Sequence, residues 1–273
     1  MRTFTQTLMC LFVSAITFAN VSTNEKEVLI ALYNSTQGEQ WKNTWDLNAP
    51  VETWYGVTLK NNHVVELSLE FNNLQGPLPQ EIGELAYLQK LNLGFNKISG
   101  ELPTSIGNLK ELVSLELFMN SLEGKIPNEI GQLSNLEILR LYSNNLIGEI
   151  PTTIGNLTNL KELLLGSNNL TGTIPTQIAT LINLQKLSLI DNEISGEVPV
   201  EIAGLLQLEE LILASNELTG DLPFEISHFP KLETFMVSDN KLNQDYISMI
   251  NGNNPNFLDF NASTEATTIT DND

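Results

Sequence analysis

Residues 160–183 read LKELLLGSNNLTGTIPTQIATLIN, and nearly the same 24-residue pattern occurs seven times along the chain. The shared pattern is LxxLxLxxNxLxGxIPxxIGxLxx, and no insertion separates one copy from the next. The copies begin at Val64, Leu88, Leu112, Leu136, Leu160, Leu184 and Leu208, and a partial eighth begins at Leu232. A fixed period of this length predicts a stacked solenoid, in which each copy forms one coil and contacts only its neighbours.

Each coil is expected to begin with a short strand. Around Leu163 and Leu165 the alternation points those two side chains inward, and stacked strands form one parallel sheet of eight. An asparagine follows every strand, and a buried amide there can satisfy backbone groups of its own coil and the next. We therefore predict a buried structural ladder of eight asparagines: Asn72, Asn96, Asn120, Asn144, Asn168, Asn192, Asn216 and Asn240.

Two further columns of the repeat hold glycine and proline. Glycine supplies a backbone conformation or a close approach that a Cβ atom would hinder. Proline fixes φ and carries no N–H group, which suits a tight turn on the convex side. The columns are Gly76, Gly100, Gly124, Gly148, Gly172, Gly196 and Gly220, and Pro79, Pro103, Pro127, Pro151, Pro175, Pro199 and Pro223.

The stretches NNLTGTIPTQI, NNLIGEIPTTIGNL and NKISGELPTSIGNL resemble plant-type leucine-rich repeats, as in extracellular domains of receptor-like kinases and in polygalacturonase-inhibiting proteins. The leader LIALYNSTQGEQWKNTWDLNAPVETWYGVTL resembles the N-terminal cap of such proteins and is closest in wording to secreted bacterial members. Plant caps carry a CxWxGVxC frame, but here Glu52 and Leu59 stand in place of the cysteines, which argues against a plant origin. The resemblance implies an α/β solenoid: a right-handed curved leucine-rich repeat with one parallel sheet on the concave face and an irregular or 3₁₀ convex side. It also implies a protein-binding role, without identifying a ligand.

The two ends of the chain differ from the repeats. Residues 1–19 hold one arginine and an apolar run that ends near Ala19, which predicts a secretory signal peptide; Met9 before Cys10 disfavours a lipoprotein. We assign residues 20–63 to an N-terminal cap, 64–243 to the repeats and 244–260 to a C-terminal cap. Residues 261–273 are expected to form an acidic disordered tail. The protein is thus predicted to be secreted or held at the cell surface.

The N-terminal cap is predicted to contain a helix over residues 24–34, followed by Trp41, Trp45, Trp54 and Tyr55. Such aromatic residues can form a carbohydrate-binding platform. The interpretation that we favour is a hydrophobic lid on the first coil, because a solenoid must cover the open end of its core.

Composition and motifs narrow the classes of function. The chain has 273 residues and a net charge of −20, so nucleic acid and anionic lipid are disfavoured as partners. The two histidines, His63 and His228, lie about seven coils apart, and the only cysteine falls in the signal peptide. These features predict no enzyme activity, no metal centre, no cofactor and no membrane insertion. A column of Glu101, Glu149, Glu197 and Asp221 permits a calcium-binding edge, although a solvated face is the simpler interpretation.

The repeat pattern does not fix the residue type at outward positions of the predicted strands. Large side chains occupy these positions in the first four coils. Candidate ligand-binding residues are Phe71, Phe95, Phe118, Met119, Arg140 and Tyr142. Clusters of aromatic residues with arginine are typical of interfaces. An alternative packs Phe71 and Phe95 back over the strand ends as core. The parity of Phe118 and Tyr142 instead points them outward, which predicts that their truncation leaves the melting temperature nearly unchanged.

The predicted function is therefore a secreted, non-enzymatic binding module that recognises a protein, a peptide or a surface glycan through its concave face. The alternative is a structural or ice-binding repeat protein of the cell surface. An ice-binding face needs a regular array of threonine or asparagine, and the convex column is mixed: Gln80, Thr104, Asn128, Thr152, Thr176, Val200 and Phe224.

Overall fold

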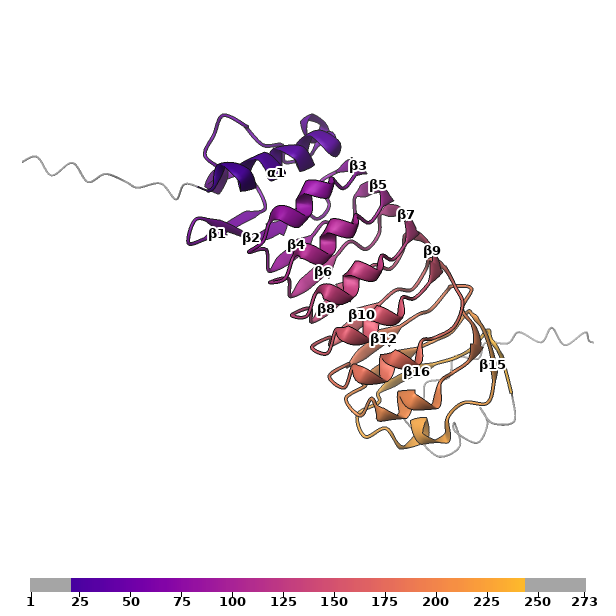
Figure 1. The fold of residues 1–273 in the computed structure, drawn as a ribbon. Coiled ribbons are helices and arrows are strands. Elements are labelled where there is room, and N and C mark those ends of the chain that lie inside the picture. The colour runs from indigo at the N-terminus through magenta and orange to yellow at the C-terminus, as the bar shows by residue number, and fades with distance from the viewer. Residues whose placement is uncertain (1–20, 244–273) are drawn as a thin grey trace, which may run out of the picture.

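The computed structural model describes residues 21–243 as a curved solenoid of stacked coils (Figure 1). The predicted signal peptide, C-terminal cap and acidic tail lie outside these described residues. In the described part, no helix is long and apolar enough to cross a membrane.

The concave face is one sheet in the order β1-β2-β4-β6-β8-β10-β12-β14-β16. Its eight repeat strands are parallel, as the leucine alternation predicts, and each pairs with the next at an offset of 24 residues. The strand β1 (Val57–Lys60), which the repeat does not predict, adds an antiparallel ninth strand to β2. The repeat strands are β2 (His63–Ser68), β4 (Lys90–Asn92), β6 (Ser114–Glu116), β8 (Ile138–Arg140), β10 (Glu162–Leu164), β12 (Lys186–Ser188), β14 (Glu210–Ile212) and β16 (Thr234–Met236).

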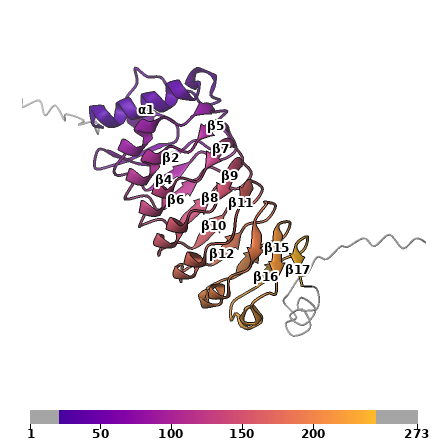
Figure 2. The same cartoon turned by 45° about the vertical axis from the view of Figure 1, so that its right-hand side comes forward.

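Two further parallel sheets lie where the chain leaves the concave face, and the sequence pattern does not predict them. Figure 2 shows β5 to β11 in a row beside the concave strands. One sheet contains β3 (Gln75–Pro77), β5 (Lys97–Glu101), β7 (Ser121–Lys125), β9 (Asn145–Glu149) and β11 (Asn169–Thr171); the other contains β13 (Ser195–Glu197), β15 (Glu217–Gly220) and β17 (Lys241–Leu242).

The convex side of every full coil is a five-residue 3₁₀ helix. The proline column stands at the N-cap of each one, for example Pro151 with φ −65°, where its fixed φ suits the turn. These helices are η3 (Gln80–Glu84), η4 (Thr104–Asn108), η5 (Asn128–Gln132), η6 (Thr152–Asn156), η7 (Thr176–Thr180), η8 (Val200–Gly204) and η9 (Phe224–His228).

The asparagine ladder joins consecutive coils. The Asn168 side chain accepts a hydrogen bond from the Leu146 N–H at 3.1 Å and donates to the carbonyls of Leu141 and Leu165 at 3.1 and 2.9 Å. The sequence predicts that all eight asparagines are buried. In the structure Asn72, Asn144, Asn168 and Asn216 are buried, whereas Asn96, Asn120, Asn192 and Asn240 are partly exposed although they make the same kinds of bonds.

The helix α1 (Thr23–Ser35) and two short 3₁₀ helices, η1 (Gly38–Gln40) and η2 (Val51–Thr53), precede the first coil. Trp41, Trp45 and Trp54 are each at most 4% exposed, and their rings pack together at 4.8 and 4.7 Å. These tryptophans form a hydrophobic lid and present no platform for a carbohydrate. Of the four cap aromatics named from the sequence, Tyr55 alone is exposed.

Glycines of the repeat column have left-handed backbone, and a side chain of the preceding coil lies close to several of them. Gly172 has φ +76°, and a Cβ atom there would lie 2.6 Å from Glu149 Cγ, whereas a Cβ at Gly204 meets nothing within 4 Å. We expect Gly172→Ala to lower the free energy of unfolding by about 1–2 kcal/mol and Gly204→Ala to have no such cost. Urea denaturation of the two variants measures this difference, and equal midpoints would contradict it.

Candidate functional site

Four aromatic side chains form a continuous row along the ends of the first four concave strands. Phe71 stacks on Phe95 with ring centroids 4.0 Å apart, and Phe95 meets Phe118 edge to face at 5.3 Å. Phe118 in turn stacks on Tyr142 at 4.8 Å. We call Phe71, Phe95, Phe118 and Tyr142 the aromatic row. Its members lie about one repeat apart in four consecutive coils, so the stacking of the repeats brings these rings together.

Two residues of this row and the neighbouring Met119 have left-handed backbone. Phe71, Phe95 and Met119 have φ of 56°, 52° and 52°, and Phe71 and Met119 are 51% and 41% exposed. Left-handed backbone is unfavourable for bulky residues. Later coils place small polar residues at this column in the same conformation: Ser143, Ser167, Asp191, Ser215 and Asp239. Local structure therefore does not explain the phenylalanines and the methionine.

Phe118 differs from its sequence prediction. Its parity is outward, as predicted, but the side chain is only 6% exposed. The ring lies over Gly94 of the preceding coil, so close that a Cβ atom there would be 2.7 Å from it, and Phe95 and Tyr142 cover its other sides. The expectation that Phe118 is an exposed side chain is therefore wrong, and we now expect its truncation to lower the melting temperature. The alternative that placed Phe71 in the core is also wrong, and Phe95 is partly buried.

Arg140 is held by two carboxylates of the adjacent coils. Its Nη1 lies 2.9 Å from Glu116 Oε2, and its Nη2 lies 2.7 Å from Glu162 Oε2. Burial opposes the charge of Arg140, yet the bonds and charges of Glu162 and Glu116 leave its pKa above the usual value. Ser114 also donates to Glu116. Arg140 is thus a fixed part of the concave surface whose charge is already balanced.

Burial raises the pKa of the Tyr142 hydroxyl, and Glu70 and Glu116 add to this effect while Arg140 opposes it. Glu70 accepts a hydrogen bond from Asn92 at 3.0 Å. Neither Glu70 nor Asn92 is a candidate in the sequence analysis. Glu70 is visible only as the polar member of a column that continues with Gly94, Phe118 and Tyr142.

The sequence analysis places the large outward side chains in the first four coils, but further apolar residues lie farther along the concave face. Ile138, Leu164, Ile190, Ile212 and Met236 point outward from β8 and later coils and are partly exposed. Their signal was present as aliphatic residues at outward strand positions. Lys186 lies among them, and its hydrogen bond to Glu210, against the effect of burial, raises its pKa. The apolar surface therefore extends beyond the first four coils.

A second apolar surface lies on the convex side of the fifth to seventh coils. Ile182 and Leu206 are 61% and 53% exposed, and Val200 and Phe224 are 59% and 53% exposed. We call these four residues the convex patch. Unlike the aromatic row, it has a single aromatic member, Phe224, whose ring packs against His228.

The histidines lie in separate places. His63 Nδ1 is 3.1 Å from the buried Glu25 carboxylate, and its ring stacks on Tyr87 at 3.7 Å, whereas His228 contacts Ser227 and Phe224. Within residues 21–243, no three side chains of His, Cys, Asp or Glu gather closely enough to hold a metal ion.

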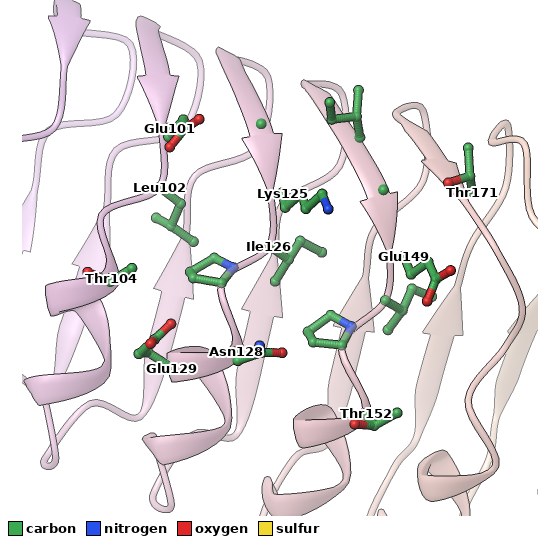
Figure 3. Close-up of a pocket in the computed structure, with 16 residues that line it drawn as sticks. Glu101, Leu102, Thr104, Lys125, Ile126, Asn128, Glu129, Glu149, Thr152 and Thr171 are labelled. Atoms are coloured by element: carbon green, nitrogen blue, oxygen red, sulfur yellow. The ribbon is translucent and has the colours of Figure 1, made fainter.

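An open hollow of about 850 Å³ lies between the second sheet and the convex helices (Figure 3). In Figure 3, Lys125 lies between Glu101 and Glu149 of the acidic column, and Thr104, Asn128 and Thr152 line the side of the 3₁₀ helices. A cation between two carboxylates lowers the local negative charge, which makes this edge unfavourable for calcium.

Family models for leucine-rich repeats match residues 158–218 and residues 87–109 and 135–157. No curated protein sequence matches the chain significantly. Among solved structures, PEPR1–AtPEP1 is 34% identical over 81% of this chain and 32% of its own, with a TM-score of 0.76. The plant peptide hormone receptor RGFR1 in complex with RGF2 is 40% identical over 63% and 28%, with a TM-score of 0.63.

A plant ice-binding protein is 29% identical over 88% of this chain and 79% of its own, with a TM-score of 0.76. The chain spans about a third or less of the two receptor chains. The repeat models match three of its segments, and the coils of the receptors superimpose on its own. The chain belongs to the leucine-rich repeat proteins.

Proposed function

We propose that the protein is a non-enzymatic binding module that acts outside the cytoplasm and recognises an extended polypeptide through its concave face. The observation that carries this proposal is the aromatic row, together with Met119 beside it. RGFR1, which shares the fold, is named as a peptide hormone receptor. That similarity supports a peptide as the class of ligand.

The energetics of the row favour a partner. Phe71 and Met119 expose apolar surface and also occupy left-handed backbone, and both features cost free energy in the isolated protein. Serine at Ser143, Ser167 and Ser215 shows that the repeat folds without large side chains in this column. Large side chains that the fold does not need are expected where they bury surface against a ligand.

The dimensions of the row suit an extended chain. Four coils at the spacing of strands in a sheet span about 15 Å. An extended peptide rises by about 3.3 Å per residue, so four or five residues would cover the row. Beyond Tyr142, the partly exposed Ile190 and Ile212 continue the apolar surface. A longer peptide could thus follow the concave face across several coils.

The experiment is a selection of 12-residue peptides from a display library on the immobilised full chain, with affinity measured for the selected peptides. We expect Phe71→Ser with Met119→Ser to weaken binding at least about tenfold. The melting temperature should not fall, because serine is the residue that other coils use here. Unchanged affinity of the double variant would contradict the proposal, as would failure to select any peptide.

Ice binding is the second candidate, because the plant ice-binding protein aligns over most of its own length. The flat second sheet presents Gln75, Ser99, Glu123, Ile147 and Thr171 outward, which is a mixed column with a charge and an isoleucine. The convex column is mixed as well. Neither array repeats one ice-matching side chain, so the concave surface is the better candidate; thermal hysteresis in a solution of the protein would reverse this preference.

A further inference from the structure

The charges of the concave strands are paired with one exception. Among outward positions of the described strands, Glu66 pairs with Lys90, Glu116 and Glu162 pair with Arg140, and Glu210 pairs with Lys186. Glu70 follows β2 at the next outward position and has no cation within 4 Å in residues 21–243. Its contact with Asn92 is a hydrogen bond from a neutral amide.

The surroundings of Glu70 are partly apolar. Gly94 occupies the next place in its column, and the Phe118 ring lies over that glycine, so the ring fills the place beside Glu70. Tyr142 stacks on Phe118 from the other side. Burial is the largest cause of the raised pKa of the Tyr142 hydroxyl, and the charge of Glu70 adds to it. No hydrogen bond engages that hydroxyl within the described residues.

The buried polar side chains next to Glu70 already have hydrogen-bond partners. Asn92 Oδ1 accepts the Gly94 N–H at 3.0 Å, and both oxygens of Glu116 are engaged, by Ser114 and by Arg140. Asn92 and Glu116 are 6% and 7% exposed. The charged group left free to bind is therefore a Glu70 carboxylate oxygen, beside the rings of the aromatic row.

We infer that Glu70, beside the aromatic row, forms a subsite for one cationic side chain, lysine or arginine, of the bound polypeptide. This inference rests on the proposed function and specifies one residue of its ligand. An ammonium or guanidinium group donates to the carboxylate, and its aliphatic stem packs on the aromatic row. The rings exclude water from the pair, which strengthens the charge-assisted hydrogen bond.

The test uses the peptides selected on the full chain. Selected peptides should be enriched in lysine or arginine at one position. Replacing that residue by glutamine should weaken binding to the wild-type protein about tenfold. The same replacement should weaken binding to the Glu70→Gln variant less than about twofold, because its partner is already gone.

Glu66→Gln is the matched control, since it removes the same charge from a neighbouring carboxylate that Lys90 already pairs. This control should keep the tenfold dependence on the cation. An equal dependence in wild type and Glu70→Gln would overturn the subsite, and so would selected peptides without a fixed cation. If such peptides still lose affinity for the Phe71→Ser, Met119→Ser variant, the concave binding face stands and only the subsite fails. If they do not, both proposals fail.

Discussion

Replacing Phe118 by alanine is expected to lower the free energy of unfolding by about 3 kcal/mol. The side chain is 6% exposed and is enclosed by Gly94, Phe95 and Tyr142. Its removal leaves a cavity on the concave surface. It also removes the ring contacts with Phe95 and Tyr142, each of which contributes to stability. Urea denaturation of the full chain provides the measurement.

Phe71→Ala is the control for Phe118→Ala, because Phe71 belongs to the same row but is 51% exposed. Phe71→Ala should cost less than about 1 kcal/mol, because about half of the Phe71 side chain is already exposed. Alanine also tolerates the left-handed backbone poorly, so the substitution gains little there. Equal changes of the denaturation midpoint for the two variants would show that the row is a uniform surface, contrary to the packing described above.

Asn168→Ala is the second change for which we expect a large effect, again about 3 kcal/mol. The amide and carbonyl of Asn168 satisfy the Leu146 N–H and the carbonyls of Leu141 and Leu165, and the side chain is buried. Alanine leaves these groups without partners inside the solenoid, and a buried polar group without a partner is costly. Because each coil contacts only its neighbours, the loss weakens the junction between the fourth and fifth coils.

The adjacent Asn169 supplies the control. It has the same chemistry and lies one residue away, but it is exposed. Asn169→Ala should change the free energy of unfolding by less than about 0.5 kcal/mol. A small effect at both positions would mean that the ladder does not stabilise the stack.

The repeat-defining columns could be predicted from sequence because each has one physical requirement. Leu163 and Leu165 point inward by strand alternation, and Pro151 stands at a turn that needs its fixed φ. The second sheet could not be predicted in the same way. Its strands are three to five residues long, and β3 consists of Gln75, Gly76 and Pro77, a composition that does not favour strands.

The site was predicted in part, and Phe118 shows why. Strand parity gives the direction of the Cα–Cβ bond, whereas the resting place of the ring depends on the neighbouring coil. The small residue Gly94 in the same column leaves room for the ring to fold back along the solenoid. Phe71 shows the opposite case, because its left-handed backbone directs the side chain away from the core. That backbone conformation cannot be inferred from the identity of one residue.

Glu70 and Arg140 show a further limit. The sequence places Arg140 beside Tyr142 as a candidate interface residue, and the structure shows that two carboxylates of adjacent coils neutralise it. At the outward positions on and directly after the described concave strands, the carboxylate without an ion pair is that of Glu70. Pairing across coils depends on rotamers and distances between columns, so it becomes apparent only in three dimensions.

The measurement that tests concave binding most directly is the location of a bound peptide. A selected peptide that carries a benzophenone group is cross-linked to the full chain by light, and the modified residues are identified by mass spectrometry. We predict cross-links at the outward residues of the first four coils, around Phe71, Phe95, Met119 and Tyr142. Cross-links confined to the convex patch of Ile182, Val200, Leu206 and Phe224 would contradict concave binding and assign recognition to the opposite face.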